Sequence, residues 1–539
     1  MLHLSSESLQ NRKDWDQAGI GIPDYDIKNV ALNTQKHPKW VHIGPGNIFR
    51  GFVAALAQDL IEQGEMDSGI TVFSTFDHEV YEKIYIPYEN LTLQVQMHGN
   101  GELEKEVIAS IGEAVMIDAT NPDGWTRARQ IMADPDLQMV SFTITEKGYQ
   151  IQDINGVFLP DVSKDFDTSP DNDFPRNTMS IVAALLYSRF KAGASPIAMV
   201  SMDNFSHNGD KLKNSVVTIA QNWVDNGLAD AGFVTYLTSG KVAFPWSMID
   251  KITPRPDPQV SQHLKEIGFA DTEIVITKFR TYIAPFVNAE STQYLVVENA
   301  FPNGRPPLEK ANVYITDRET VDKVERMKVT TCLNPLHTAM SVIGCVLGYQ
   351  KISDEMKDPA IVKLIRGVGE IEGMKVVVNP GIIDPHTFLK EVIEERFPNP
   401  YMPDTPQRIA TDTSQKVGIR FGNTIKSYME REDLDPKTLK YIPFAIAGWC
   451  RYLLAIDDQG NTMELSADPM LAELQSYLTG IEFGNPKSYT GQLEPILKNK
   501  LIFGVDLFEA GVGKKIEDYF VEMIAGPGAT RAALEKITK

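Results

Sequence analysis

Short apolar runs that alternate with helical patterns in the first half of the chain constrain its fold more than any other feature. Such runs occupy residues 40–43, 70–74, 139–144 and 196–201. They are largely apolar rather than alternating with polar residues, as strands are when helices cover both faces of a parallel sheet. The apolar residues within 49–60 follow the 3.6-residue period of a helix. This pattern predicts an α/β fold with a doubly wound domain of Rossmann type.

The pattern changes near residue 320. Beyond it long helical patterns dominate, for example at residues 321–347 and 415–430, and strand candidates become few. A turn-rich loop at residues 302–307 precedes the change, and 539 residues are too many for one ordinary domain. We therefore expect an N-terminal extension (residues 1–36), a Rossmann-type NAD-binding domain (37–319) and a mainly α-helical substrate-binding domain (320–539).

Composition and charge exclude several classes of partner. A formal net charge of -20 disfavours a phosphate backbone, so we expect no nucleic acid. No apolar run reaches the roughly 18 residues of a membrane span, and Met1–Trp15 lacks the apolar core of a signal peptide. Cys332, Cys345 and Cys450 are too widely spaced for a disulfide framework. We expect a cytoplasmic protein that acts on a small molecule and has no membrane partner.

The segment after the first apolar run has the composition of a nucleotide-binding turn. Gly44, Pro45 and Gly46 open the first strand–turn–helix unit, where glycine lets the backbone approach a pyrophosphate at a helix N-terminus. Phe49 stands where the third glycine of such a turn usually lies. Asp77, just beyond the second apolar run, is placed to accept from ribose hydroxyls and to repel the 2′-phosphate of NADP, which favours NAD. An ordinary helix-start role for Asp77 explains its position equally well.

Residues 325–337 contain the strongest candidates for proton transfer. In a helical frame Lys328, Asn334 and His337 lie within a few turns of one another, beside an apolar stripe. A lysine partly removed from water suits acid/base work near neutral pH. An asparagine can donate to a substrate oxygen, and a histidine can orient a hydroxyl. On spacing alone, an amphipathic helix with solvated polar groups explains these residues somewhat better.

Two other routes to the same chemistry find less support. The nine histidines are scattered and no HxxxH or CxxC pair occurs, so we expect no metal site. Tyr187 and Lys191 form a YxxxK pattern on an apolar helix. They lack the glycine-rich sequence that accompanies a Tyr–Lys catalytic couple, so we interpret this pair as a coincidence.

An ordered series of motifs resembles the polyol-specific long-chain dehydrogenases, a family that includes mannitol 2-dehydrogenases and the mannonate and altronate oxidoreductases. The resemblance runs from about residue 38 to the C-terminal region. No single motif is diagnostic, but their shared order makes chance implausible. The motifs are GPGNIFR at 44–50, TITEKGY at 143–149, SMDN at 201–204 with NG at 208–209, FPWSMIDKITP at 244–254, VEN at 297–299, GRP at 304–306 and the Lys-Asn-His segment at 328–337.

This resemblance implies a Rossmann-type domain and a mainly α-helical domain with the active site between them. It implies that Lys328 is the catalytic acid/base and that no metal takes part. Asn204 and Asn334 would donate to the substrate oxygen, and His337 would bind a substrate hydroxyl. Glu325, one helical turn before the lysine, would link it to solvent.

The resemblance also implies substrate and coenzyme contacts. Asp250, Arg408 and Lys416 would contact the substrate. The residues expected to bind NAD, from the turn and from the family motifs together, are Gly44, Gly46, Asn47, Arg50, Asp77, Thr145 and Glu146.

One spacing departs from the family pattern. Five residues, instead of four, separate Lys328 from Asn334. On a regular helix the extra residue rotates the lysine by about 100° relative to Asn334 and His337. Either a bulged turn absorbs this residue, or the lysine enters from a loop before the helix begins.

The sequence separates the members of the family poorly. A sugar acid carries a carboxylate that mannitol lacks, and Arg408 or Lys416 could hold it, but neutral-sugar members have cations at similar positions. The form of residues 328–337 and the long N-terminal extension resemble the mannonate oxidoreductase branch, so we expect D-mannonate and D-fructuronate as substrates. The alternatives are a mannitol 2-dehydrogenase, an altronate oxidoreductase or, from another class, a non-catalytic NAD(H)-binding redox sensor. A monomer is the default expectation.

Overall fold

The computed structural model describes residues 1–153 and 155–539, which form two compact units. Unit 1 comprises Met1–His98 and Glu102–Asp322, and unit 2 comprises Gly99–Gly101 and Lys323–Lys539. The chain passes from one to the other within helix α12 (Arg318–Met327). The sequence placed this boundary after residue 319, at the start of the same helix.

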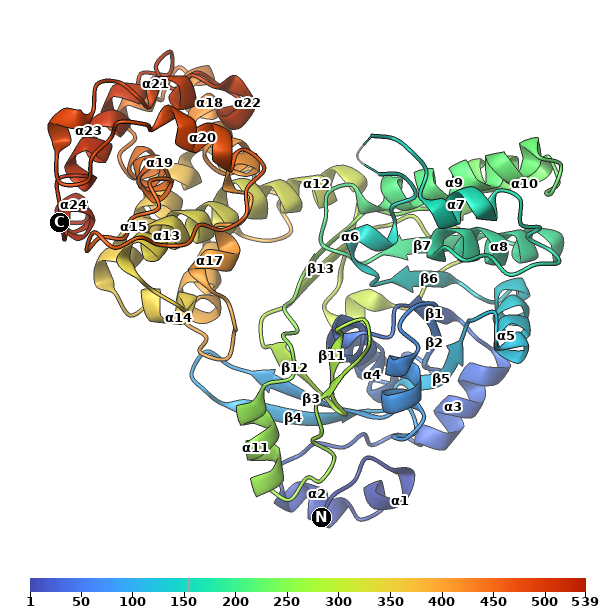
Figure 1. Cartoon of the computed structure of the whole chain (residues 1–539). Coiled ribbons are helices and arrows are strands. Elements are labelled where there is room, and N and C mark those ends of the chain that lie inside the picture. The colour runs from blue at the N-terminus through green and yellow to red at the C-terminus, as the bar shows by residue number, and fades with distance from the viewer. Residues whose placement is uncertain (154) are drawn as a thin grey trace. The chain divides into compact units, whose positions relative to one another are not determined.

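A six-stranded parallel sheet forms the centre of unit 1 (Figure 1). Its strand order is β5-β2-β1-β6-β7-β8, so the chain builds outward from β1 on one side and then from β6 on the other. The strand order reverses between β1 and β6, so the loops that follow these two strands run in opposite directions. Doubly wound folds bind their ligands in the crevice at such a switch point. The strands are β1 (Trp40–Ile43), β2 (Ile70–Ser74), β5 (Ile111–Met116), β6 (Met139–Phe142), β7 (Ile197–Ser201) and β8 (Val242–Ala243).

Helices cover both faces of this sheet, which explains why its strands are apolar throughout. In β7, Ile197 and Met199 belong to one core cluster, whereas Ala198 and Val200 belong to the other. Successive side chains of a strand point to opposite faces, so both faces are buried. The doubly wound α/β prediction is confirmed. The covering helices include α4 (Ala54–Glu62) on one face and α5 (Pro122–Ala133), α8 (Thr178–Lys191), α9 (Asn208–Asp225) and α10 (Gly232–Thr238) on the other.

Unit 1 also contains smaller sheets and short helices that the sequence did not predict. One sheet has the order β12-β3-β4, a second the order β14-β13-β9, and β10 and β11 form a hairpin. The strands are β3 (Thr92–Met97), β4 (Leu103–Ile108), β9 (Ser247–Asp250), β10 (Val275–Ile276), β11 (Tyr282–Ile283), β12 (Phe286–Glu290), β13 (Tyr294–Glu298) and β14 (Tyr314–Thr316). The unpredicted helical segments are η2 (Tyr81–Tyr85), α6 (Thr145–Gly148), α7 (Pro160–Asp165), α11 (Pro258–Glu266) and η3 (Leu308–Ala311), whereas η1 (Phe49–Val53) begins the helix predicted within residues 49–60.

Residues 1–36, expected to form an extension, pack into unit 1. They fold into α1 (Ser6–Leu9), α2 (Arg12–Gln17) and α3 (Ile27–Lys36). Trp15 is fully buried and meets the ring of Phe269 edge to face at 6.2 Å. Thr34 Oγ1 accepts a hydrogen bond from the backbone N–H of Gly69 at 2.7 Å. A few anchoring side chains therefore hold a mostly polar segment against the domain.

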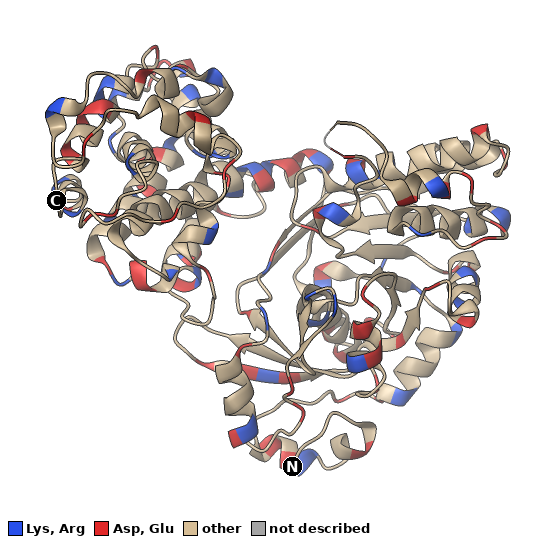
Figure 2. Cartoon of the chain, in the orientation of Figure 1, with Lys and Arg blue, Asp and Glu red and all other residues tan. Residues whose placement is uncertain are grey.

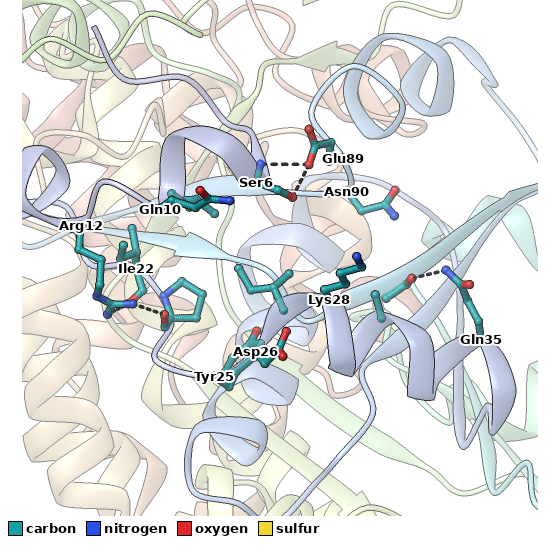
Figure 3. A pocket seen from close by; sticks show the side chains of 15 residues that line it. Ser6, Gln10, Arg12, Ile22, Tyr25, Asp26, Lys28, Gln35, Glu89 and Asn90 are labelled. Carbon is teal, nitrogen blue, oxygen red and sulfur yellow. Dashed lines mark hydrogen bonds between the residues drawn. The ribbon is translucent and has the colours of Figure 1, made fainter.

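A pocket of about 690 Å³ opens beside these helices (Figure 3). Several of its polar groups already bind one another: Arg12 donates to Pro23 O at 2.9 Å, and Ser6 N donates to Glu89 Oε2 at 3.0 Å. None of the predicted site residues lines it. Its lining residues are Ser6, Leu9, Gln10, Arg12, Ile22, Pro23, Tyr25, Asp26, Ile27, Lys28, Ala31, Gln35, Glu89, Asn90 and Gly112.

The burial of Trp15 predicts that the N-terminal helices stabilise unit 1. Trp15→Ala should lower the free energy of unfolding of this unit by about 3–5 kcal/mol, as deletion of a fully buried aromatic side chain does. Urea denaturation followed by circular dichroism measures this. Lys13→Ala, at an exposed position on the same helix, is the control and should leave the midpoint unchanged. Equal midpoints for wild type and Trp15→Ala would contradict the packing role.

Unit 2 is mainly helical, as predicted. Its centre is α13 (Asn334–Leu347), which packs against α19 (Tyr441–Tyr452), and α19 packs in turn against α23 (Gly513–Met523). The other α-helices are α14 (Ile352–Glu355), α15 (Pro359–Arg366), α16 (Pro385–Glu391), α17 (Pro406–Ile409), α18 (Asn423–Glu430), α20 (Leu471–Tyr477), α21 (Glu494–Leu497), α22 (Lys500–Phe503) and α24 (Ala529–Ile537). The π and 3₁₀ turns are η4 (Lys328–Cys332), η5 (Gly367–Glu372), η6 (Gly373–Val376), η7 (Val392–Arg396), η8 (Thr413–Gln415), η9 (Gly418–Gly422), η10 (Pro436–Thr438) and η11 (Pro486–Ser488).

The helical stretch Arg318–Leu347 is the one described segment long and apolar enough, by length and composition, to cross a membrane. Within its most apolar window, 72% is buried inside the protein, as in the core helix of a folded domain. Lys and Arg are interspersed with Asp and Glu in both units (Figure 2). The structure thus spreads its positive residues among negative ones, and the net charge of -20 disfavours binding to a phosphate backbone.

Candidate active site

The backbone after β1 forms the turn that the sequence assigned to a nucleotide. Gly44 has a φ of +112°, and a Cβ there would lie 2.2 Å from the carbonyl oxygen of Thr143, so only glycine fits. At Gly46 a Cβ would meet nothing within 4 Å, which leaves open space beside the backbone. A dinucleotide pyrophosphate needs both a tight turn and free access to the backbone. The residues present therefore fit the predicted coenzyme.

Asn47 and Arg50 brace this turn from inside the protein. Asn47 Nδ2 donates to Tyr282 O at 3.0 Å, and Arg50 Nη2 donates to Asn47 Oδ1 at 2.9 Å. Arg50 Nη1 donates to Thr92 Oγ1 and to Ala284 O, both at 2.9 Å. Burial lowers the pKa of Arg50, which is only 1% exposed. Both residues were expected to bind NAD, and in the structure their side chains hold the turn in place.

Phe49, at the position of the missing third glycine, packs against a buried histidine. Its ring stacks on that of His42 at 4.2 Å. His42 is hydrogen-bonded to Ser141 Oγ at 2.7 Å and to Thr143 Oγ1 at 2.8 Å. Burial lowers the pKa of His42 to about 3, so its ring is neutral. These contacts join the ends of β1 and β6 next to the Gly44 turn.

Asp77, the expected ribose acceptor, lies just beyond β2 and is only 6% exposed. Its Oδ2 accepts from Thr277 Oγ1 at 2.7 Å and also from Thr281 Oγ1, and both threonines come from the β10–β11 hairpin. Its Oδ1 is buried and has no hydrogen-bond partner among residues 1–153 and 155–539. A carboxylate fixed by two hydroxyls with one unsatisfied oxygen fits an acceptor of ribose hydroxyls.

The loops that follow β6 and β7 are tied together by Asp203. This side chain accepts from Thr145 N at 3.0 Å and from Tyr149 Oη at 2.7 Å. Burial raises the pKa of Asp203, although these hydrogen bonds act in the opposite direction. Asp203 therefore holds Thr145 in place, and the predicted Asn204 follows Asp203 directly in the sequence. Asp203 was not predicted as a site residue, although the SMDN motif contains it.

The other two predicted residues of unit 1 differ in burial. Glu146 lies in α6 and forms an ion pair with Lys211 at 3.2 Å, and its side chain is 56% exposed. Asp250 is the last residue of β9, is 5% exposed and lies opposite Tyr294 of β13. Glu146 thus lies at the surface of unit 1, whereas Asp250 is buried within it.

Lys328 begins the π turn η4, directly after α12. Leu333 N donates to Lys328 O at 3.1 Å, five residues back rather than four, and α13 begins at the next residue, Asn334. The bulged turn, one of two explanations for the extra residue, is the one observed. Lys328 is only 3% exposed, and Glu325 lies in the last turn of α12.

His337, one turn into α13, lies in a strongly positive environment. Its Nε2 is 3.5 Å from Asp404 Oδ2 and has no hydrogen-bond partner among the described residues. Burial and nearby cations hold the pKa of His337 well below its usual range, so the imidazole is neutral at physiological pH. The cations responsible, in decreasing order of effect, are Arg420, Arg408, Arg396 and Lys416.

Arg408 and Lys416, the two substrate contacts expected from the sequence, belong to this group of four cations. Arg408 donates through Nε to Asp404 Oδ1 at 2.6 Å. Lys416 donates to the carbonyl oxygen of Thr411, and burial is the main cause that lowers its pKa. Arg396 and Arg420 were not predicted. A signal was present for Arg420, which lies four residues after Lys416.

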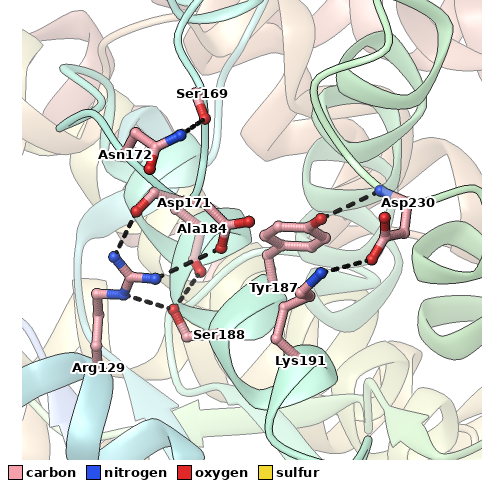
Figure 4. Close-up of polar contacts among 9 residues, drawn as sticks. All are labelled: Arg129, Ser169, Asp171, Asn172, Ala184, Tyr187, Ser188, Lys191 and Asp230. Atoms are coloured by element: carbon pink, nitrogen blue, oxygen red, sulfur yellow. Dashed lines mark hydrogen bonds and ion pairs between the residues drawn. The ribbon is translucent and has the colours of Figure 1, made fainter.

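The Tyr187–Lys191 pair is engaged in ordinary structural contacts (Figure 4). Tyr187 Oη accepts from Asp230 N at 3.2 Å, and Lys191 forms an ion pair with the Asp230 carboxylate at 2.8 Å. Tyr187 is 2% exposed. These contacts agree with its interpretation as a coincidental YxxxK. In the described part of the chain no group of three or more His, Cys, Asp or Glu could hold a metal ion.

Two family models match this chain, and together they cover most of its length. Residues 38–310 match the mannitol dehydrogenase Rossmann domain, and residues 320–522 match the mannitol dehydrogenase C-terminal domain. The chain belongs to the mannitol dehydrogenase family. The resemblance drawn from the ordered motifs is thus confirmed.

Individual relatives extend this result. The chain is 56% identical to the D-mannonate oxidoreductase of Thermotoga maritima, and the match covers 99% of each protein. Among solved structures it resembles a D-sorbitol dehydrogenase in substrate-free form, with a TM-score of 0.77, 23% identity and coverage of 96% and 98%. It also resembles the Pseudomonas fluorescens mannitol 2-dehydrogenase ternary complex with NAD and D-mannitol, with a TM-score of 0.68, 23% identity and 98% of each chain covered. At this identity the two structures show the shared fold.

Glu355, in α14, is a buried acid that was not predicted, and it interacts electrostatically with Asp404, the partner of Arg408. It is fully buried, and neither carboxylate oxygen has a hydrogen-bond partner among the described residues. Burial, reinforced by Asp358 and Asp404, raises its pKa well above the usual 4.5. The folded protein therefore holds Glu355 as a neutral acid.

This burial predicts a pH-dependent stability. Above about pH 4.5 the unfolded chain loses the Glu355 proton while the folded chain keeps it, so stability falls with rising pH, at about 1.4 kcal/mol per pH unit, until the folded pKa is reached. Glu355→Gln cannot lose a proton, so relative to wild type it should gain stability between pH 5 and pH 8. Urea denaturation across this range measures the difference. If the difference in free energy of unfolding between Glu355→Gln and wild type were the same at every pH, the raised pKa would be contradicted.

Proposed function

We propose that this chain is a D-mannonate oxidoreductase, which interconverts D-mannonate and D-fructuronate with NAD(H) by hydride transfer at a secondary alcohol. The observation that carries the proposal is the 56% identity to the Thermotoga maritima D-mannonate oxidoreductase over 99% of both proteins. The four cations around His337 suit a substrate that bears a carboxylate.

Bound NAD would supply the hydride acceptor for oxidation of the alcohol carbon, and bound NADH the hydride donor for reduction of the ketone. The chain would hold the pyrophosphate at the Gly44–Gly46 turn, which Asn47 and Arg50 brace. Asp77 would accept from the ribose hydroxyls through the oxygen that its threonine partners leave unsatisfied. Thr145 and Glu146, on the loop fixed by Asp203, would complete the coenzyme contacts.

The proton moves through Lys328. Its amine accepts the hydroxyl proton as the hydride leaves the carbon, and its ammonium returns a proton to the oxygen when the ketone is reduced. Asn204 and Asn334 donate to this oxygen and stabilise the charge that develops on it. The neutral His337 binds a substrate hydroxyl, and Glu325 passes protons between Lys328 and solvent. Asp250, Arg408 and Lys416 contact the rest of the substrate.

Replacement of the lysine tests this assignment. Lys328→Ala should lower kcat/KM for D-fructuronate reduction by about 10²–10⁴-fold, because it removes the proton donor. Loss of NADH absorbance measures the rate, and NADH fluorescence checks that the coenzyme still binds. Lys357→Ala changes a lysine of the same unit that pairs with Asp354 at the surface, and it should behave as wild type. Full activity of Lys328→Ala would remove the lysine from the mechanism.

A substrate panel tests the choice within the family. With NAD, oxidation of D-mannonate should exceed that of altronate, mannitol, arabinitol and sorbitol, measured as kcat/KM in the presence of a chelator. A preference for mannitol or altronate would move the enzyme to another branch. NADH binding without turnover of any member of the panel would instead support a redox sensor.

We further propose a monomeric cytoplasmic enzyme with no nucleic-acid or membrane partner. Its cysteines, Cys332, Cys345 and Cys450, are all free and buried, which suits a reducing compartment. Light scattering coupled to size exclusion determines the oligomeric state.

A further inference from the structure

Arg420 lies at the centre of the π turn η9, which is fixed against another helix. A Cβ at Gly422 would lie 1.8 Å from Phe503 O, and one at Gly418 would lie 2.6 Å from Ile502 O. Glycine at both ends therefore lets the turn rest directly on the backbone of α22. From this turn the Arg420 guanidinium reaches the first turns of α13, where its Nη1 donates to the hydroxyl of Thr338.

Among residues 1–153 and 155–539, Arg420 has no counterion. Among the described residues no carboxylate forms a hydrogen bond or ion pair with it, and burial alone lowers its pKa, to about 10. The guanidinium therefore stays charged at neutral pH. A largely buried cation costs free energy unless an anion accompanies it. The unbalanced charge points to an anionic ligand.

The other cations of the cluster have polar partners. Arg408 is bound to Asp404, and Lys416 donates to the Thr411 carbonyl. Asp412 and Asp468 also act on Lys416, in the direction that favours its charge. Arg408 and Lys416 are the two cations that the sequence singled out as substrate contacts. Their partners leave them less suited than Arg420 to bind an added carboxylate.

Arg420 also lies close to the residue proposed to hold a substrate hydroxyl. Its partner Thr338 follows His337 directly on α13. Of the four cations that lower the pKa of His337, Arg420 has the largest effect. The positive charge of Arg420 therefore acts next to His337, the residue proposed to bind a hydroxyl of the sugar.

We propose that Arg420 binds the carboxylate of the sugar acid and is the residue that makes the enzyme prefer an aldonate or uronate to a neutral polyol. The planar guanidinium can bind a carboxylate through two parallel hydrogen bonds, and the Thr338 hydroxyl holds it in position. This inference rests on the proposed function, because it concerns the same substrate site.

The experiment compares charged and neutral substrates. Arg420→Gln should lower kcat/KM for D-mannonate and D-fructuronate by about a hundredfold or more, mainly through KM, as loss of a buried charge partner does. D-mannitol has no carboxylate, so its kcat/KM, however low in the wild type, should not fall by the same factor in Arg420→Gln. Arg420→Lys should retain part of the activity on D-mannonate. The matched control is Arg431→Gln, whose guanidinium is paired with Asp433 at the surface of the same unit, and it should behave as wild type.

Chemical rescue separates binding from folding. In Arg420→Ala, added guanidinium at concentrations that leave the wild type active should restore part of the D-fructuronate reduction, while Arg431→Ala should not respond. A wild-type KM for D-mannonate in Arg420→Gln would overturn the inference. So would equal losses on D-mannonate and D-mannitol without rescue, which indicate a structural role. A wild type that turns over D-mannitol but not D-mannonate would instead overturn the proposed function.

Discussion

The hydrogen bond from Leu333 N to Lys328 O sets the geometry on which the candidate site of unit 2 depends. It closes a turn of five residues instead of four, so that α13 can begin at Asn334 while Lys328 stays buried. A regular turn would rotate the lysine by about 100° relative to the residues that follow. The regular spacing of α13 then fixes His337 and Thr338, and Thr338 receives Arg420 from a second π turn.

The sequence was sufficient for the parts of the fold that follow from local pattern. Continuous apolar runs such as residues 139–144 and 196–201 become buried parallel strands, because few other structures accommodate them. The tight turn at Gly44 was also predictable, because a backbone that turns sharply between a strand and a helix often requires glycine. Residues 1–36 were harder, because a few scattered apolar side chains, Trp15 among them, anchor an otherwise polar segment and leave no periodic pattern.

The parts of the site that the sequence could not specify depend on partners that are distant along the chain. Asp77 was predicted, but its partners Thr277 and Thr281 lie about two hundred residues later, and no local pattern predicts these hydrogen bonds. In the sequence, only its position four residues after Lys416 connects Arg420 with the predicted substrate contacts. Its significance comes from its burial and from the lack of a described carboxylate beside it. Neither property has a local signature.

The positive environment of His337 has a consequence for the proposed reaction. D-mannonate and D-fructuronate carry the same carboxylate, so a cation cluster that holds one holds the other equally well. Binding through a carboxylate that substrate and product share lowers the KM of both without favouring either one. The enzyme would then work at low concentrations of either sugar acid, and, as for any catalyst, the coenzyme ratio and the two metabolite concentrations set the net direction.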